Sequence, residues 1–329
     1  MLEPVGQYAR GLLEESGESP ATRERHAEYF VALAEVARSE LMGPEHGAWL
    51  ERLEHEHDNL RRSLWWARET HDVETGLRLS GALGWFWWMH GYLGEGRRWV
   101  EGFLSEDSKS SQPAGMPMRA KALYGAGELA FGQGDLARAA ELLEESLVLY
   151  RELGDGVGAA GVLVELGQVA RAQGDHDRAA ALSEEGLALS RALGERRAAA
   201  IALNTLGHVE RCRGDTEGAI AHYEQSLDHF RQIGHEEWGG AYTLANLGVV
   251  ALERGELERA LALSEESLSL YERRGNKAGV ALALINLGDV AHKRGDNERA
   301  AVLYEEALAL QRELGNERGV ARALARLTN

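Results

Sequence analysis

The residues best suited to metal or proton chemistry form one short run. Glu54, His55, Glu56, His57 and Asp58 are consecutive, and each side chain can bind a metal ion or move a proton. On a helix only residues three or four apart share a face, so these five side chains would point in different directions. A zinc site needs two ligands on one face and further ligands from elsewhere. The run indicates a solvated or ion-paired helix, with a metal site as the alternative, and we predict no metal ligands.

A glycine-rich string offers a second candidate chemistry. Residues 156–161, GVGAAG, satisfy the GxGxxG pattern of dinucleotide-binding loops. The string occupies a turn that recurs as GNKAGVAL and GNERGVAR, with a helix rather than a strand before it, so we interpret it as a turn between repeats. No phosphate-binding GxxxxGK followed by Ser or Thr occurs, and no Ser/His/Asp or Cys/His set has a catalytic spacing. We therefore expect a protein that is not an enzyme and that uses no cofactor.

Aromatic residues gather in the first third of the chain. Seven of the eight tryptophans fall within residues 49–99, and the densest cluster is Trp85, Phe86, Trp87, Trp88 and Tyr92. Aromatic residues on every side of a helix favour burial against two neighbours. The alternative is an aromatic pocket for a ligand.

Three series of glycines recur in the C-terminal two-thirds of the chain and mark where its predicted helices lie. The first comprises Gly127, Gly167, Gly207, Gly248 and Gly288, with spacings of 40, 40, 41 and 40 residues. The second follows seven residues later, at Gly134, Gly174, Gly214, Gly255 and Gly295. The third closes each unit, at Gly154, Gly194, Gly234, Gly275 and Gly315. A period of about 40 residues predicts an array of repeats.

Each series has a physical reason. The second predicts a helix end in the left-handed conformation, followed by an acidic N-cap, which is aspartate in four repeats and the poorer cap Glu256 in the other. The first lies inside a helix, where glycine costs about 1 kcal/mol relative to alanine, so we expect it to admit a neighbouring helix closely. Apolar residues recur at helical spacing between the glycines, for example Leu203, Leu206 and Val209. Each unit is therefore predicted to be a pair of antiparallel helices.

This pattern resembles the tetratricopeptide-repeat (TPR) family. Its mark is Leu, Gly, a small residue twelve later and another seven beyond, seen here as Leu206, Gly207, Ala219 and Ser226. The resemblance covers about residues 118–329 and is to the longer-repeat subclass, without the usual terminal proline. It implies an all-α, right-handed superhelical solenoid of antiparallel helix pairs.

The resemblance also implies a concave groove lined by the first helix of each pair. The residues that would face a guest are Tyr124, Glu128, Phe131, Gln168, Arg171, Asn204, His208, Arg211, Asn246, Val249, Glu253, Asn286, Asp289 and Lys293. The three asparagines resemble those that bind the backbone of an extended peptide in longer-repeat TPR proteins, and an amide offers both a donor and an acceptor. The alternative is that they are ordinary polar residues on an exposed face.

Composition limits the partners. The net charge of −17 disfavours binding to phosphate backbones, so we expect no direct nucleic-acid binding. No stretch approaches the roughly 20 apolar residues that span a membrane. Cys212 is the sole cysteine and no export signal is visible, so we expect a cytoplasmic protein. The expected partner is a protein or peptide in the groove, or a small inducer.

The N-terminal third resembles another arrangement. Residues 25–35, 49–67 and 76–104 each have the pattern of an amphipathic helix, and residues 56–61 read EHDNLR. The order and spacing of these three predicted helices resemble those of a segment found in bacterial STAND-type regulators of the AfsR-like and MalT-like group. In those proteins the segment joins the ATPase and winged-helix module to the TPR array. The resemblance implies a winged-helix remnant at 1–18, a divergent helical section with a degenerate repeat at 19–110, and five regular repeats plus the start of a sixth at 111–329. It implies the ligand-sensing region of a signalling ATPase or transcriptional regulator, and the alternative is a free-standing TPR adaptor.

Overall fold

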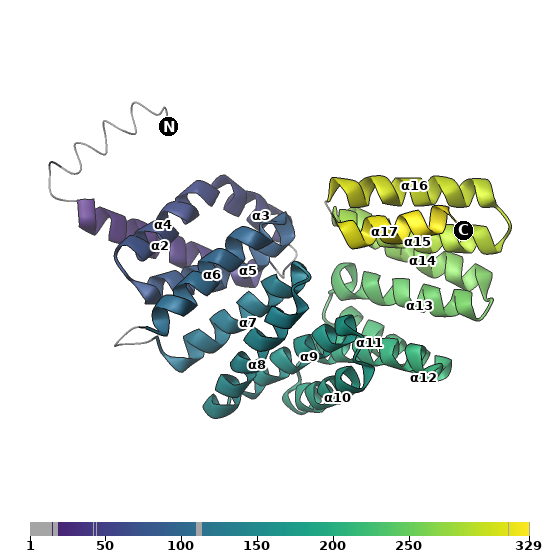
Figure 1. Ribbon diagram of the computed structural model, residues 1–329, viewed down its shortest axis with the longest axis horizontal. Coiled ribbons are helices and arrows are strands. Elements are labelled where there is room, and N and C mark those ends of the chain that lie inside the picture. Colours follow the sequence, from purple (N-terminus) through teal and green to yellow (C-terminus); the bar gives the residue numbers. More distant parts are fainter. Residues whose placement is uncertain are drawn as a thin grey trace. The chain divides into compact units, whose positions relative to one another are not determined.

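The chain is helical wherever its structure is described. The computed structural model describes residues 15, 19–41, 43, 45–109, 114–314 and 316–328, and over these residues it has sixteen α-helices, one π-helix and no strand. The all-α prediction is therefore confirmed. The chain divides into two compact units, residues 1–158 and 159–329, and the point of division falls within helix α9. Figure 1 labels the helices of both units. The predicted divisions after residues 18 and 110 stay predictions, and residues 1–18 lie outside the described part except for Glu15.

The first unit is built around α5. Its helices are α2 (Ser19–Glu40), α3 (His46–His55), α4 (His57–Glu69), α5 (Val73–His90), α6 (Leu93–Asp107), α7 (Met116–Gly132) and α8 (Leu136–Leu153). Helix α5 packs against α2, α4, α6 and α7, and α7 pairs with α8. Two of the helices predicted from the amphipathic pattern are shorter than expected. Residues 49–67 divide at Glu56 into α3 and α4, and residues 76–104 divide at Gly91, whose φ of 75° ends α5.

The second unit is a regular array. Its helices are α9 (Gly156–Gln173), α10 (His176–Leu193), α11 (Arg196–Arg213), α12 (Thr216–Gln232), the π-helix η1 (Glu236–Gly240), α13 (Ala241–Glu253), α14 (Leu257–Arg273), α15 (Lys277–Lys293), α16 (Asn297–Glu313) and α17 (Glu317–Leu327). Successive helices pair, with α11 on α12, α13 on α14 and α15 on α16, and α17 begins a further pair against α16. First helices also meet one another, because α13 contacts both α11 and α15.

The glycine series have the roles that the sequence predicts. All five glycines of the second series have positive φ, between 78° and 85°. Asp135, Asp175, Asp215 and Asp296 then cap the next helix, each accepting a hydrogen bond from the backbone N–H three residues on, whereas Glu256 makes no such bond. In the first series a Cβ atom at Gly127 would lie 2.7 Å from Leu143 Cγ, and one at Gly207 would lie 2.8 Å from Tyr223. The close approach of the second helix therefore requires glycine.

The π-helix explains the single irregular spacing. Three of the intervals between the third glycine series and the next first-series glycine are 13 residues, but Gly234 and Gly248 are 14 apart. The π-helix η1 lies within this interval, and a π-turn holds one more residue than an α-turn. Gly239, at the end of this turn, still packs on Phe230 as Gly279 packs on Tyr271 in the following repeat. The extra residue is absorbed before α13 begins.

The aromatic cluster divides between core and surface. Phe86 and Trp87 are fully buried, whereas Trp88 is 41% exposed and stacks on Trp85 with ring centroids 5.4 Å apart. The packing prediction therefore holds for Phe86 and Trp87. A nearby pocket of about 390 Å³ is lined instead by Trp65, Trp99 and charged residues. No helix in the described ranges is long and apolar enough to cross a membrane.

Candidate ligand-binding groove

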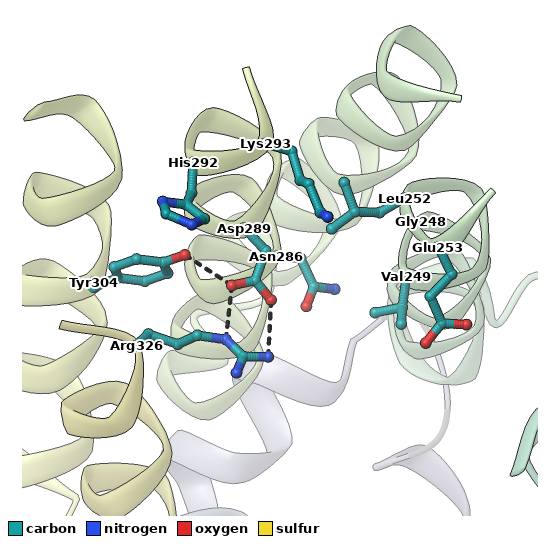
Figure 2. Close-up of a pocket in the computed structure, with 10 residues that line it drawn as sticks. All are labelled: Gly248, Val249, Leu252, Glu253, Asn286, Asp289, His292, Lys293, Tyr304 and Arg326. Carbon is teal, nitrogen blue, oxygen red and sulfur yellow. Dashed lines mark hydrogen bonds and ion pairs between the residues drawn. The ribbon is translucent and has the colours of Figure 1, made fainter. Parts of the chain in front are cut away.

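Five of the predicted groove residues meet in one pocket of the second unit. The pocket has a volume of about 400 Å³, and Val249, Glu253, Asn286, Asp289 and Lys293 all line it. They come from α13 and α15, the first helices of two consecutive repeats (Figure 2). Five of the residues that the TPR resemblance assigns to the groove thus share one surface.

Five further residues line the same pocket and were not predicted. They are Gly248, Leu252, His292, Tyr304 and Arg326. Two of them, Tyr304 and Arg326, could have been found from the spacing of the repeats. Tyr304 lies sixteen residues after Gly288, as Tyr223 does after Gly207, and in both repeats the ring packs on the glycine. Arg326 lies forty residues after Asn286, so it takes the asparagine's place in the incomplete last repeat.

Asp289 is held by two partners at one side of the pocket. Figure 2 shows its carboxylate between Tyr304 and Arg326. Tyr304 donates to Asp289 Oδ1 at 2.8 Å, and Arg326 donates through Nε at 2.8 Å and through Nη2 at 3.2 Å. Burial, and then the hydrogen bond to Asp289, raise the pKa of Tyr304, so its hydroxyl stays protonated as a donor. Lys293 is exposed and forms no ion pair within the described residues, so its charge is available to a ligand.

The three asparagines join neighbouring repeats. Asn204 donates to Thr243 Oγ1 at 2.6 Å and accepts from Asn246 Nδ2 at 2.9 Å. Asn286 donates to the carbonyl of Ala245 at 3.1 Å. Asn204 and Asn286 are 7% and 3% exposed, so they lie deeper than an exposed groove face requires. Their amide groups therefore stabilise the contact between first helices, and of the three asparagines Asn286 also lines the pocket.

One amide oxygen in this network has no partner. Asn286 Oδ1 is buried and accepts no hydrogen bond within the described residues, and Asn286 lines the pocket. An unsatisfied buried acceptor costs about 1–3 kcal/mol. A donor from a bound guest would relieve that cost.

The remaining predicted residues lie beside the pocket or apart from it. Arg211 donates to Glu253 at 2.8 Å, which links α11 to the pocket. His208 is half-buried on α11, where burial, and then the nearby charges of Arg171 and Arg211, lower its pKa to about 4. Gln168 donates to Glu165 on its own helix, at 2.8 Å. Tyr124, Glu128 and Phe131 are half-buried on α7 of the first unit. Whether any of these residues binds a guest stays a prediction.

A series of antiparallel helix pairs, with a pocket between the first helices of two consecutive pairs, defines the class of helical-repeat solenoids. The tetratricopeptide-repeat profile matches residues 118–192, 158–232, 197–273 and 240–313. The chain therefore belongs to the tetratricopeptide-repeat family.

Two solved structures share the fold. The structure titled as a Rap protein complexed with Competence and Sporulation Factor has 15% identity and a TM-score of 0.65, and the match covers 92% of this chain and 85% of that one. The structure of NprR in complex with its cognate peptide NprX has 16% identity and a TM-score of 0.60, covering 87% and 82%. At these identities the likeness shows the fold alone.

Curated relatives match part of the chain. "Putative HTH-type transcriptional regulator Rv0890c" of Mycobacterium tuberculosis is 30% identical over 162 residues, which is 47% of this chain. A protein of the same description from Mycobacterium bovis matches equally. The match spans 18% of the length of each of these relatives.

Proposed function

We propose that the groove of the second unit binds an extended peptide or a segment of a partner protein, without catalysis. The observation that carries this proposal is Asn286 Oδ1, a buried acceptor without a partner in the wall of the pocket. A peptide N–H group is the donor that every extended chain offers, whatever its sequence. The complex of NprR with its peptide NprX, on a similar fold, supports the same use of the groove.

The side chains around Asn286 suit a guest with a carboxylate and an apolar side chain. Lys293 offers a cation on one side, whereas Glu253 and Asp289 offer carboxylates whose charge is largely met by Arg211 and Arg326. Val249 and Leu252 supply apolar surface between them. A carboxylate on the guest near Lys293, and an apolar side chain against Val249, would complete the contacts.

The proposal is tested by selecting peptides from a random phage-displayed library on the purified chain. The affinity of a selected peptide is then measured by fluorescence anisotropy. We expect Lys293→Ala and Asn286→Ala each to weaken binding about tenfold, which corresponds to about 1.4 kcal/mol. Val302→Ala is the control, because Val302 is 54% exposed on α16 and does not line the pocket. Failure to select any peptide, or affinities that neither groove variant changes, would refute the proposal.

Backbone recognition has its own test. A series of the selected peptide, N-methylated at one amide at a time, should lose affinity sharply at one or two positions and little elsewhere. Uniform small losses would mean that side chains alone are recognised, and Asn286 would then have no part in binding.

We further propose that this chain is the sensing region of a STAND-type regulator. The order of the N-terminal helices and the EHDNLR segment support this, as does the similarity to HTH-type regulators over part of their length. Ligand binding would act by favouring one of two conformations, which an ATPase module elsewhere would detect. Sequencing the full-length transcript tests this: an upstream ATPase module is expected, and a transcript without one would favour a free-standing adaptor.

A further inference from the structure

A cluster of metal-binding side chains lies on α10 and α11, outside the pocket described above. Its members are His176, His208 and Cys212, and one ligand atom from each lies within 4.8 Å of the others. His176 is the first residue of α10, whereas His208 and Cys212 are one turn apart on α11. The sequence run at residues 54–58, by contrast, forms no such group within the described residues.

The repeat architecture brings these three side chains together. His208 and Cys212 share a helix face because they are four residues apart. Gly174, with a φ of 82°, ends α9, and Asp175 caps α10 by accepting from the N–H of Arg178 at 3.0 Å. These two residues fix where α10 begins, and α10 packs on α11. His176 is thereby placed beside the His208 face.

The distances suit tetrahedral coordination. Zinc bonds of about 2.3 Å to sulfur and 2.0–2.1 Å to nitrogen, at a tetrahedral angle, separate the two ligand atoms by about 3.5 Å. Cys212 Sγ and His208 Nδ1 are 3.6 Å apart. The imidazole centroids of His176 and His208 are 6.2 Å apart, so both rings can present a nitrogen to one ion.

A simple thiol–imidazole hydrogen bond accounts for only part of the cluster. It would explain the contact between Cys212 and His208 but would leave His176 without a role. His176 Nδ1 is buried and has no hydrogen-bond partner within the described residues. A metal ion would give all three side chains one shared partner.

The surrounding charges both help and oppose a cation. Arg171 and Arg211 lie near His208. Their positive charges oppose a dication, but Arg211 is already paired with Glu253 at 2.8 Å. When a metal ion binds, the negative charge of the Cys212 thiolate would cancel one of the two positive charges of the ion. Cys212 is exposed, so the fourth coordination position would be open to water.

We propose that His176, His208 and Cys212 bind one transition-metal ion of the zinc type in an open, three-ligand site. Two imidazoles and a thiolate exclude Mg²⁺ and Ca²⁺, which require oxygen ligands, and favour Zn²⁺ or Co²⁺. The site does not depend on peptide binding, because none of its ligands lines the pocket around Asn286.

The experiment is a cobalt titration of the full chain, purified without a histidine tag and stripped with a chelator. We expect one Co²⁺ per chain, with the intense visible bands of tetrahedral cobalt and a thiolate-to-cobalt charge-transfer band. Zn²⁺ should displace the cobalt. Because Cys212 is the sole cysteine of the sequence, a sulfur band can come only from this site.

Three variants complete the test. Cys212→Ser should abolish the charge-transfer band, and His176→Ala should weaken cobalt binding at least tenfold, since loss of even a supporting group costs 10–100-fold. His55→Ala, an exposed histidine on α3, should bind as the unaltered chain does. Circular dichroism verifies that each variant is folded. A titration without a sulfur band, or equal affinity in the His176→Ala variant, would overturn the proposal.

Discussion

Two glycines on α7, two residues apart, should respond in opposite ways to the same substitution. A Cβ atom at Gly125 would meet no atom within 4 Å, whereas one at Gly127 would lie 2.7 Å from Leu143 Cγ and 2.8 Å from its Cδ2. Alanine gains about 1 kcal/mol over glycine inside a helix, and both variants receive that gain. Gly125→Ala should therefore stabilise the chain by about 1 kcal/mol.

For Gly127→Ala the same gain is opposed by crowding. Carbon atoms pack best at about 3.5–4.0 Å, so α8 must move away by about 1 Å. Leu143 is fully buried and the nearest atom is close to its backbone, so the side chain cannot simply turn aside. Overpacking of this kind costs about 1–3 kcal/mol. Gly127→Ala should range from neutral to about 2 kcal/mol destabilising, which is about 1–3 kcal/mol below Gly125→Ala.

The assay is urea unfolding of the unaltered chain and the two variants, followed by circular dichroism. The free energies of unfolding are compared only if all three proteins show the same dependence on urea concentration. This dependence must be compared because repeat arrays can unfold in more than one step. Equal stability of the two alanine variants would refute the close-approach explanation for the first glycine series.

Three further predictions concern the second unit. Asn204→Ala should destabilise the chain by about 1–3 kcal/mol in urea unfolding, because Asn204 is buried and hydrogen-bonded to Thr243 and Asn246. Asn246 is only half-buried, so Asn246→Ala should cost about 1 kcal/mol at most. Equal losses of stability in the two variants would contradict the stabilising role of the buried Asn204 amide. Glu256→Asp should stabilise by about 0.5–1 kcal/mol, since Glu256 makes no capping bond and the aspartate at the equivalent position, Asp175, does; no gain in melting temperature would contradict this. Stability should fall as the pH drops from about 6.5 to about 4, because over that range His208 binds a proton more readily in the unfolded chain than in the folded chain. The fall should be smaller for His208→Gln, and identical pH profiles of stability for the two proteins would contradict this prediction.

The repeats, their caps and their glycines could be predicted because each depends on nearby residues. Positive φ at Gly134 and capping by Asp135 follow from a helix end and the residue after it. The resemblance to TPR proteins, rather than local pattern alone, placed Val249 and Asp289 on one surface, and both line the pocket.

Contacts between repeats were harder to predict. The burial of Asn204 depends on Thr243 and Asn246, about forty residues away, and a polar residue at a regular helical position gives no sign of such a partner. The division at Glu56 was missed because the apolar pattern of residues 49–67 continues through it. His176 joins His208 and Cys212 across a helix pair, so spacing along one helix shows only two of the three.

The π-turn at Glu236–Gly240 bears on how such a chain tolerates insertions and deletions. In a continuous helix one inserted residue rotates every later side chain by about 100°, which would turn an apolar face away from its neighbour. Here the rotation is cancelled within a single turn, and Gly248 resumes the series with the next interval back at 40 residues. Repeat length can therefore change by one residue between two helices without altering how the later repeats pack.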